Sequence, residues 1–198
     1  MTNYQPRNIL VTGGAGFIGS NYVRYMLGKD PEINILNLDK LTYAGSMANL
    51  EELPDKSRHH FVQGDICDQA LIVKLLEQYQ IDTIVHFAAE SHVDRSISGP
   101  REFIQTNVIG TFVLLEAARA YWETTHGLDS KKCRFHHIST DEVFGSLALT
   151  DPAFTETTAY APNLPYSASK ASSDHLVRAW HHTYGLPAVN FCLQSEMI

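Results

Sequence analysis

The chain has 198 residues, which is enough for one substantial hydrophobic core. Its formal net charge of −7 argues against a general nucleic-acid or membrane-surface binder, which would need a basic face. The three cysteines, Cys67, Cys133 and Cys192, are far apart and form no CxxC motif, so neither a disulfide framework nor a thiolate zinc site is expected. The sequence shows no signal-peptide pattern and no apolar run of membrane length, so a cytoplasmic protein is expected.

Strand and helix patterns alternate along the chain. Apolar runs predict strands at residues 8–12, 33–38, 60–62, 83–87, 135–139 and 188–193. Amphipathic patterns predict helices at residues 17–27, 69–79, 100–121 and 166–184, with a loop over 147–165. This alternation predicts an α/β fold in which a Rossmann-type, doubly wound parallel sheet forms a single domain over residues 1–198.

A glycine-rich segment lies between the first predicted strand and the first predicted helix. Gly13 and Gly14 permit a tight turn, Gly16 lets the backbone approach a pyrophosphate, and Gly19 lets the helix pack against the strand. The helix N-terminus would then face the phosphates. In this strand–loop–helix context the spacing predicts a dinucleotide site.

Asp39 ends the second predicted strand and is expected to accept hydrogen bonds from the ribose hydroxyls of an adenosine. A carboxylate there would repel a 2′-phosphate, which favours NAD over NADP. The neighbouring Lys40 weakens that preference. The alternative interpretation of the glycine segment and Asp39 is an ordinary strand–helix turn with an incidental surface aspartate.

Two later motifs indicate chemistry. Tyr166 and Lys170 are four residues apart, which places both side chains on one helix face. A close ammonium and a nicotinamide charge together could lower the pKa of a tyrosine from about 10 towards about 7, so we predict a tyrosine base. Thr140, Asp141 and Glu142 follow the fifth strand, where parallel sheets bind ligands, and the two carboxylates could act as acid and base. The alternative role for these three residues is a helix N-cap.

The ten histidines do not indicate a metal site. The pairs at 136–137 and 181–182 are sequence neighbours, which cannot present two ligands to one metal as an HExxH helix does. His92 follows the fourth strand, so a place along the dinucleotide site is plausible for it.

Several segments together resemble the extended short-chain dehydrogenase/reductase family, and within it the branch of NAD-dependent nucleotide-sugar epimerases and dehydratases. The matching segments are residues 13–19, 39–45, 64–68, 86–97, 106–107, 139–145 and 166–170. They span the chain up to about residue 189, and 39–45 and 88–97 are the most specific.

The resemblance implies that the cofactor is NAD and that a common set of residues holds it. These residues are Gly13, Gly16, Phe17, Ile18, Gly19, Asp39, Lys40, Leu41, Thr42, Asp65, Ile66, Phe87, Ala88, Ala89, Glu90, Ser91, Thr106, Tyr166 and Lys170. The implied partner is a nucleotide sugar, with no nucleic acid and no membrane involved. A homodimer through the helices at about 100–121 and 166–184 is also implied.

The implied reaction is a lyase reaction that converts dTDP-glucose to dTDP-4-keto-6-deoxyglucose, a step of dTDP-rhamnose biosynthesis. Tyr166 would accept the C4 hydroxyl proton, Glu142 would remove the C5 hydrogen, and Asp141 would protonate the departing C6 hydroxyl. Ser91 and Thr140 would contact the sugar. Hydride would leave C4 and return to C6.

The chain departs from the family in two places. Phe144 stands where the family usually has tyrosine, which is expected to have a small effect. From about residue 190 the sequence diverges, and the C-terminal substrate lobe implied by the family is missing. Two alternatives therefore stay open. The first is another nucleotide-sugar epimerase or dehydrogenase, which would not need the carboxylates of Asp141 and Glu142. The second is a non-catalytic NAD-binding fragment.

Overall fold

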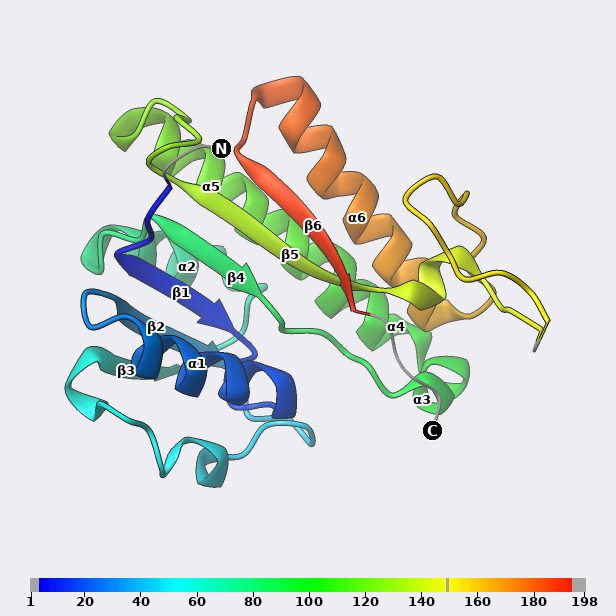
Figure 1. Cartoon of the computed structure of the whole chain (residues 1–198), viewed down its shortest axis with the longest axis horizontal. Coiled ribbons are helices and arrows are strands. Elements are labelled where there is room, and N and C mark those ends of the chain that lie inside the picture. The colour runs from blue at the N-terminus through cyan, green and yellow to red at the C-terminus, as the bar shows by residue number, and fades with distance from the viewer. Residues whose placement is uncertain (1–3, 149, 194–198) are drawn as a thin grey trace.

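The computed structural model describes residues 4–148 and 150–193, and one six-stranded parallel sheet forms its centre. The strands are β1 (Asn8–Thr12), β2 (Asn34–Asp39), β3 (His59–Gln63), β4 (Thr83–His86), β5 (Arg134–Thr140) and β6 (Ala188–Leu193). They lie in the order β3-β2-β1-β4-β5-β6 (Figure 1). This is the Rossmann order, so the predicted α/β doubly wound fold is confirmed.

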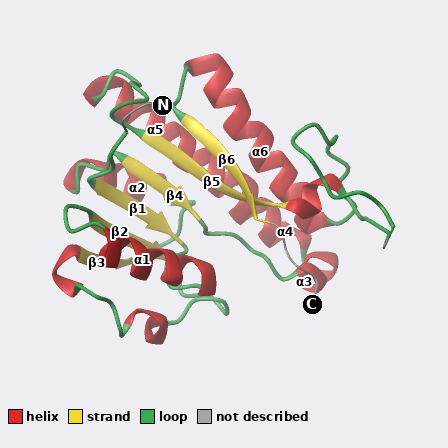
Figure 2. Ribbon diagram, in the orientation of Figure 1, coloured by secondary structure: helices red, strands yellow, loops and turns green. Residues whose placement is uncertain are grey.

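Helices connect the strands (Figure 2). The α-helices are α1 (Phe17–Lys29), α2 (Gln69–Gln78), α3 (Val93–Ser98), α4 (Pro100–Phe103), α5 (Thr111–Thr125) and α6 (Pro165–Tyr184). A π-helical segment, η3 (Ile104–Gly110), joins α4 to α5. Three short 3₁₀ helices complete the described elements: η1 (Met47–Leu50), η2 (Lys56–Arg58) and η4 (Asp141–Phe144).

Side chains of the strands alternate between two apolar layers. On one side of the sheet, Ile9 of β1 packs in a cluster with Val23 of α1. On the other side, Leu10 belongs to a larger cluster filled from α2, α5 and α6, which contains the fully buried Trp122. Figure 1 shows α1 in front of the sheet, with α2 and α5 behind it. Both faces are therefore covered, as a parallel sheet requires.

All the predicted strands are confirmed to within one residue at each end, and so are the helices at 69–79 and 166–184. The helix at 17–27 extends two residues further, to Lys29. The predicted helix over 100–121 begins at Pro100 as expected, but its middle is π-helical over Ile104–Gly110 and its last part, α5, runs on to Thr125. An interruption of this kind is common at functional sites and leaves no mark in the hydrophobic periodicity. The short helix α3 and the 3₁₀ helices were not predicted.

The topology brings the carboxyl ends of the parallel strands to one edge of the sheet, where such folds bind ligands.

The sequence was expected to diverge from about residue 190. Residues 190–193 belong to β6, which pairs with β5 in parallel, and residues 194–198 lie outside the described part of the chain. Within the described ranges, no helix has both the length and the apolar character needed to cross a membrane.

Candidate active site

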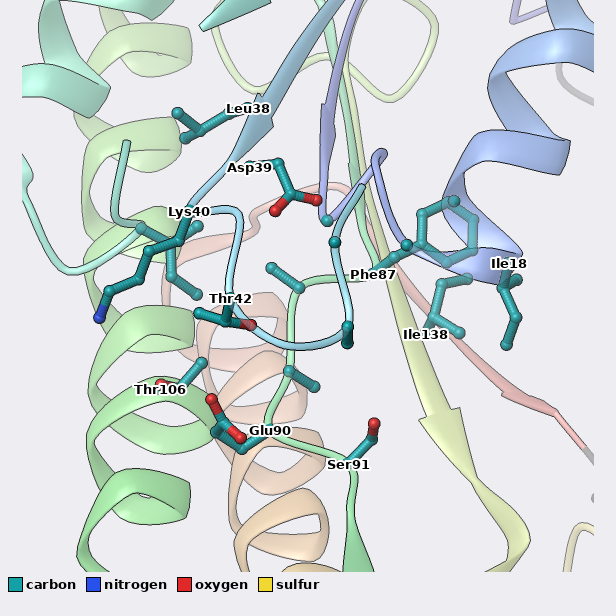
Figure 3. A pocket seen from close by; sticks show the side chains of 18 of the residues that line it. Ile18, Leu38, Asp39, Lys40, Thr42, Phe87, Glu90, Ser91, Thr106 and Ile138 are labelled. Carbon is teal, nitrogen blue, oxygen red and sulfur yellow. The ribbon is translucent and has the colours of Figure 1, made fainter. Parts of the chain in front are cut away.

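A cavity of about 500 Å³ opens at this edge of the sheet (Figure 3). Every residue predicted to bind the cofactor lines it except Leu41. Leu41 lies beside the cavity with a positive φ of 56°, and its backbone N–H donates to Asp39 Oδ1 at 2.8 Å. The lining also includes six residues that were not predicted: Leu38, Ala44, Gly45, Gly64, Ile138 and Ser139. The part that each lining residue takes in binding stays a prediction.

The glycine loop follows β1 and packs tightly against the segment after β4. Gly13 has a φ of 73°, and a Cβ at this position would lie 2.6 Å from the backbone N of Ala88. A Cβ on Gly19 would lie 2.3 Å from the carbonyl O of Gly13. These glycines are therefore required by close backbone approach as well as by the turn.

The N-terminus of α1 points its first turn at the cavity. Residues 17–19 line the cavity, Gly16 at the N-cap provides no capping side chain, and the first turn holds no acidic residue. The first amides of a helix have no partner within it, and they carry the positive end of the helix dipole. This terminus therefore fits a pyrophosphate.

Asp39 lies at the end of β2 between the glycine loop and the loop after β2 (Figure 3). Its Oδ2 accepts the backbone N–H of Ala15 at 2.9 Å, and its Oδ1 accepts that of Leu41. Each carboxylate oxygen keeps capacity for a further hydrogen bond, so both can still accept from a ribose hydroxyl. The Lys40 ammonium is 2.8 Å from Asp65 Oδ2, so a neighbouring carboxylate already compensates its charge.

Tyr166 and Lys170 lie in the first turns of α6 and line the cavity. Burial raises the pKa of Tyr166 to about 12, and the charge of Glu142 adds to this, while a hydrogen bond with the Thr140 side chain opposes it. Burial lowers the pKa of Lys170 to about 8, and its Nζ donates to the carbonyl of Ile138 at 2.7 Å. Lys170 alone therefore does not bring Tyr166 towards neutral pH, and the predicted lowering rests on the charge of a bound nicotinamide.

The residues after β5 form the short helix η4 next to Tyr166. The Thr140 Oγ1 accepts the backbone N–H of Glu142 at 3.3 Å, so the N-cap role weighed for this threonine is present. The same side chain also reaches Tyr166. Burial raises the pKa of Glu142, and the adjacent charge of Asp141 raises it further. These three residues do not line the cavity themselves and are connected to it through Tyr166.

His92 does not line the cavity. Its backbone N–H donates to the Tyr43 hydroxyl at 3.2 Å, and the Arg95 guanidinium lies 4.2 Å from the centre of the Tyr43 ring. These contacts join the loop after β2 to the start of α3. Among the residues that the structure describes, no group of three or more His, Cys, Asp or Glu side chains could hold a metal ion.

Asn107 is a central residue that the sequence analysis did not select for the site. Its Oδ1 accepts the backbone N–H of Glu90 at 2.8 Å, and its Nδ2 donates to the Glu90 carbonyl and to Ser169 Oγ, each at 2.9 Å. Asn107 therefore ties the cavity segment after β4 to the helix that carries Tyr166 and Lys170. The side chain is buried in the π-helical segment, so no regular helical pattern could reveal its task.

We expect Asn107→Ala to destabilise the chain by about 2–3 kcal/mol, because it leaves the half-buried backbone N–H and C=O of Glu90 without these partners. Urea denaturation would measure the loss. Gln105→Ala, at an exposed position of the same segment, is the control and should change stability by less than about 0.5 kcal/mol. Equal stability of the two variants would show that the Asn107 contacts are unimportant.

Comparisons with known proteins agree with this geometry. The dTDP-glucose 4,6-dehydratase of Salmonella typhimurium is 56% identical over 189 residues, which cover 91% of this chain and 52% of that protein. The crystal structure of DesIV, a dTDP-glucose 4,6-dehydratase from Streptomyces venezuelae with NAD and TYD bound, is 47% identical with a TM-score of 0.81 and covers 92% of this chain and 54% of that one. The chain spans about half the length of the curated relatives that it matches.

A second group of solved structures has a different activity on a similar fold. The crystal structure of the UDP-glucose 4-epimerase of Brucella ovis in complex with NAD is 29% identical with a TM-score of 0.77. The match covers 93% of this chain and 50% of the epimerase chain.

The sequence profile described as GDP-mannose 4,6 dehydratase matches residues 10–196, which includes most of the chain. Because this match spans the glycine loop, the sheet and the helix of Tyr166, the chain belongs to the GDP-mannose 4,6 dehydratase family.

Proposed function

We propose that this chain is the NAD-binding part of a dTDP-glucose 4,6-dehydratase. The observation that carries the proposal is the position of the Asp141–Glu142 pair in η4, next to Tyr166 at the dinucleotide cavity. Relatives that match more than nine tenths of the chain are named dTDP-glucose 4,6-dehydratases, which supports dTDP-glucose as the substrate. The product would be dTDP-4-keto-6-deoxyglucose, and the reaction is a net loss of water.

NAD fits the described residues. The uncapped first turn of α1 suits the pyrophosphate, and the Asp39 carboxylate at the other side of the glycine loop suits the adenosine ribose. Lys170 would donate to the nicotinamide ribose and also hold positive charge near Tyr166. When bound, NAD accepts a hydride from the sugar and later returns it.

Side chains of the chain itself would carry out the proton transfers and hold the sugar. Tyr166 would hold the C4 hydroxyl and accept its proton, with Thr140 hydrogen-bonded to the phenol and to the sugar. Glu142 would remove the C5 proton, which a C4 ketone makes acidic, and would give a proton back to C5 when the hydride returns to C6. Its raised pKa makes it a stronger base. Asp141 would protonate the C6 hydroxyl as it leaves. Ser91, which lines the cavity, would also contact the sugar.

The main rival activity is that of a 4-epimerase. The similarity to the Brucella ovis epimerase means that the fold alone does not separate the two activities. Oxidation at C4 needs the tyrosine and lysine in both cases, whereas elimination across C5–C6 also needs a base and an acid. The Asp141–Glu142 pair favours the dehydratase.

The proposal is tested by incubation with dTDP-glucose and NAD, followed by an assay for a 4-keto-6-deoxy product. Because the chain matches only about half of each relative, we would assay both the chain alone and a version continued by the C-terminal half of the Salmonella relative. Product from the extended version supports a dehydratase. Formation of dTDP-galactose instead would support the epimerase, and NAD binding with no turnover in either version would support a non-catalytic fragment.

We expect the chain to bind NAD at least about tenfold more tightly than NADP, a difference of about 1.4 kcal/mol. The Asp39 carboxylate would repel a 2′-phosphate, and the Lys40 ammonium that could attract it is paired with Asp65. Calorimetric titration with each cofactor measures the ratio. Lys40→Ala is the matched control and should keep the preference, whereas equal or tighter NADP binding by the unchanged chain would refute the role given to Asp39.

The oligomeric state and location belong to the same proposal. Ile109 and Phe112 are exposed on the η3–α5 segment, and Phe112 stacks edge-on against Trp180 of α6 with ring centres 5.8 Å apart. This apolar surface suits a homodimer through the two helices, which sedimentation at several concentrations would test. We place the enzyme in the cytoplasm, in the supply of dTDP-rhamnose.

A further inference from the structure

A buried carboxylate lies one helical turn beyond Lys170 on α6. Asp174 is 1% exposed and Lys170 is 5% exposed. Residues four apart on a helix share one face, so the two groups are neighbours in the interior. Buried charges are strongly disfavoured unless an opposite charge lies near. No Asp174 oxygen lies within 4 Å of the Lys170 Nζ, so the two groups interact as charges through the interior and not by direct contact.

The hydrogen bonds of Asp174 favour the charged form. Its Oδ2 accepts the Ser139 hydroxyl at 2.7 Å and the Tyr160 hydroxyl at 3.1 Å. A carboxylate that accepts two hydroxyl donors is stabilised in its ionised state. Burial raises the pKa of Asp174, while the Ser139 hydrogen bond and the charge of Lys170 lower it.

The described groups of β4, β5 and β6 next to Lys170 provide no negative charge. On β5, the Ile138 carbonyl accepts a hydrogen bond from Nζ, and His137 has its Nε2 3.2 Å from Asp174 Oδ1. Burial lowers the pKa of His137, and that of His86 on β4, well below the ordinary value, so both imidazoles are neutral at pH 7. Burial raises the pKa of Cys192 on β6, so its thiol is neutral too.

We propose that Asp174 is a positioning residue whose buried carboxylate keeps Lys170 protonated. It acts across one turn of α6 and is itself fixed by Ser139 of β5 and by Tyr160 of the loop before α6. This electrostatic effect of Asp174 on Lys170 is a property of the chain alone. Its consequence, an ammonium available beside Tyr166 near neutral pH, rests on the proposed function.

The direct test is nitrogen-15 NMR of the lysine side chains of this chain, titrated with pH, with Lys170 assigned by its loss in Lys170→Met. Asp174→Asn keeps the shape and one acceptor oxygen but removes the charge. Tyr160→Phe is the matched control, because it removes one hydrogen bond to the same carboxylate and leaves the charge in place. We expect Lys170 to titrate near 8 in the unchanged chain and in Tyr160→Phe, and about one to three pH units lower in Asp174→Asn.

A Lys170 titration that Asp174→Asn leaves unmoved, or that Tyr160→Phe lowers equally, would overturn the proposal. A second measurement needs no variant and covers the case in which Asp174→Asn does not fold. The carbon-13 shift of the Asp174 carboxyl should show an ionised group at pH 7 in the unchanged chain, and a protonated carboxyl would overturn the proposal. Neither experiment uses substrate or NAD, so each outcome is independent of whether the dehydratase proposal holds.

Discussion

Tyr166→Phe is expected to abolish oxidation of the sugar while leaving NAD binding within about threefold of the unchanged protein. The phenol is the group placed to accept the C4 hydroxyl proton, and general base catalysis typically contributes about 10²–10⁴-fold to a rate. The ring stays and only its hydrogen bond with Thr140 is lost, so the stability cost is about 1 kcal/mol. Reduction of bound NAD during a single turnover, read by the absorbance of the reduced nicotinamide in the extended version, measures the effect.

Tyr184→Phe provides the control for that experiment. Tyr184 ends the same helix, is exposed and lies outside the cavity, so its loss should leave the oxidation rate unchanged. Persistent reduction of bound NAD by Tyr166→Phe would show that another group is the base.

Glu142→Gln and Asp141→Asn are expected to separate oxidation from elimination. Oxidation at C4 uses Tyr166 and Lys170, so reduced cofactor should still form from dTDP-glucose in both variants. Elimination then lacks either the base for C5 or the acid for the C6 hydroxyl, each worth about 10²–10⁴-fold. The expected result in the extended version is therefore reduced cofactor that accumulates on the protein with little 4-keto-6-deoxy product.

The control for the acid pair is Glu156→Gln, an exposed carboxylate in the loop before α6. It should give normal product at the normal rate. Normal product yield from both Glu142→Gln and Asp141→Asn would mean that these carboxylates only form the turn after β5. The proposal would then revert to an epimerase or a dehydrogenase.

The sequence predicted most of the sheet because each strand is marked by a local apolar run and each βα turn by a local motif. The glycine loop is an example, since its spacing alone requires the turn that Gly13 adopts. Contacts between distant segments were not predictable in this way. Asn107 joins the segment after β4 to α6 from a π-helical turn, and Asp174 finds its partners on β5 and in a loop. Their importance depends on what the fold brings next to them.

The residues of the candidate site were likewise predicted where a local motif marks them and missed where only the fold brings them together. Of the residues selected in the segments after β1, β2 and β4, only Leu41 does not line the cavity, whereas Ala44 and Gly45 after β2 line it and were not selected. Ile138 and Ser139 line the cavity but were not selected, because only Thr140, Asp141 and Glu142 of the segment that begins at Ser139 were given a chemical role. The pKa of Tyr166 was beyond sequence analysis as well, because it depends on the extent of burial and on the distance to Glu142.

The position of β1 in the middle of the sheet has a consequence for the order of folding. β1 pairs with β2 on one side, but its partner on the other side is β4, where Ile9 lies opposite Thr83. A chain leaving the ribosome can therefore assemble β1, β2 and β3 early, yet one edge of β1 stays open until β4 has been synthesised. Pairing of segments so far apart in sequence is slow, because the intervening loop must close first. The nascent chain should thus pass through a stage in which its central strand is an unprotected sheet edge, the stage at which aggregation competes most strongly.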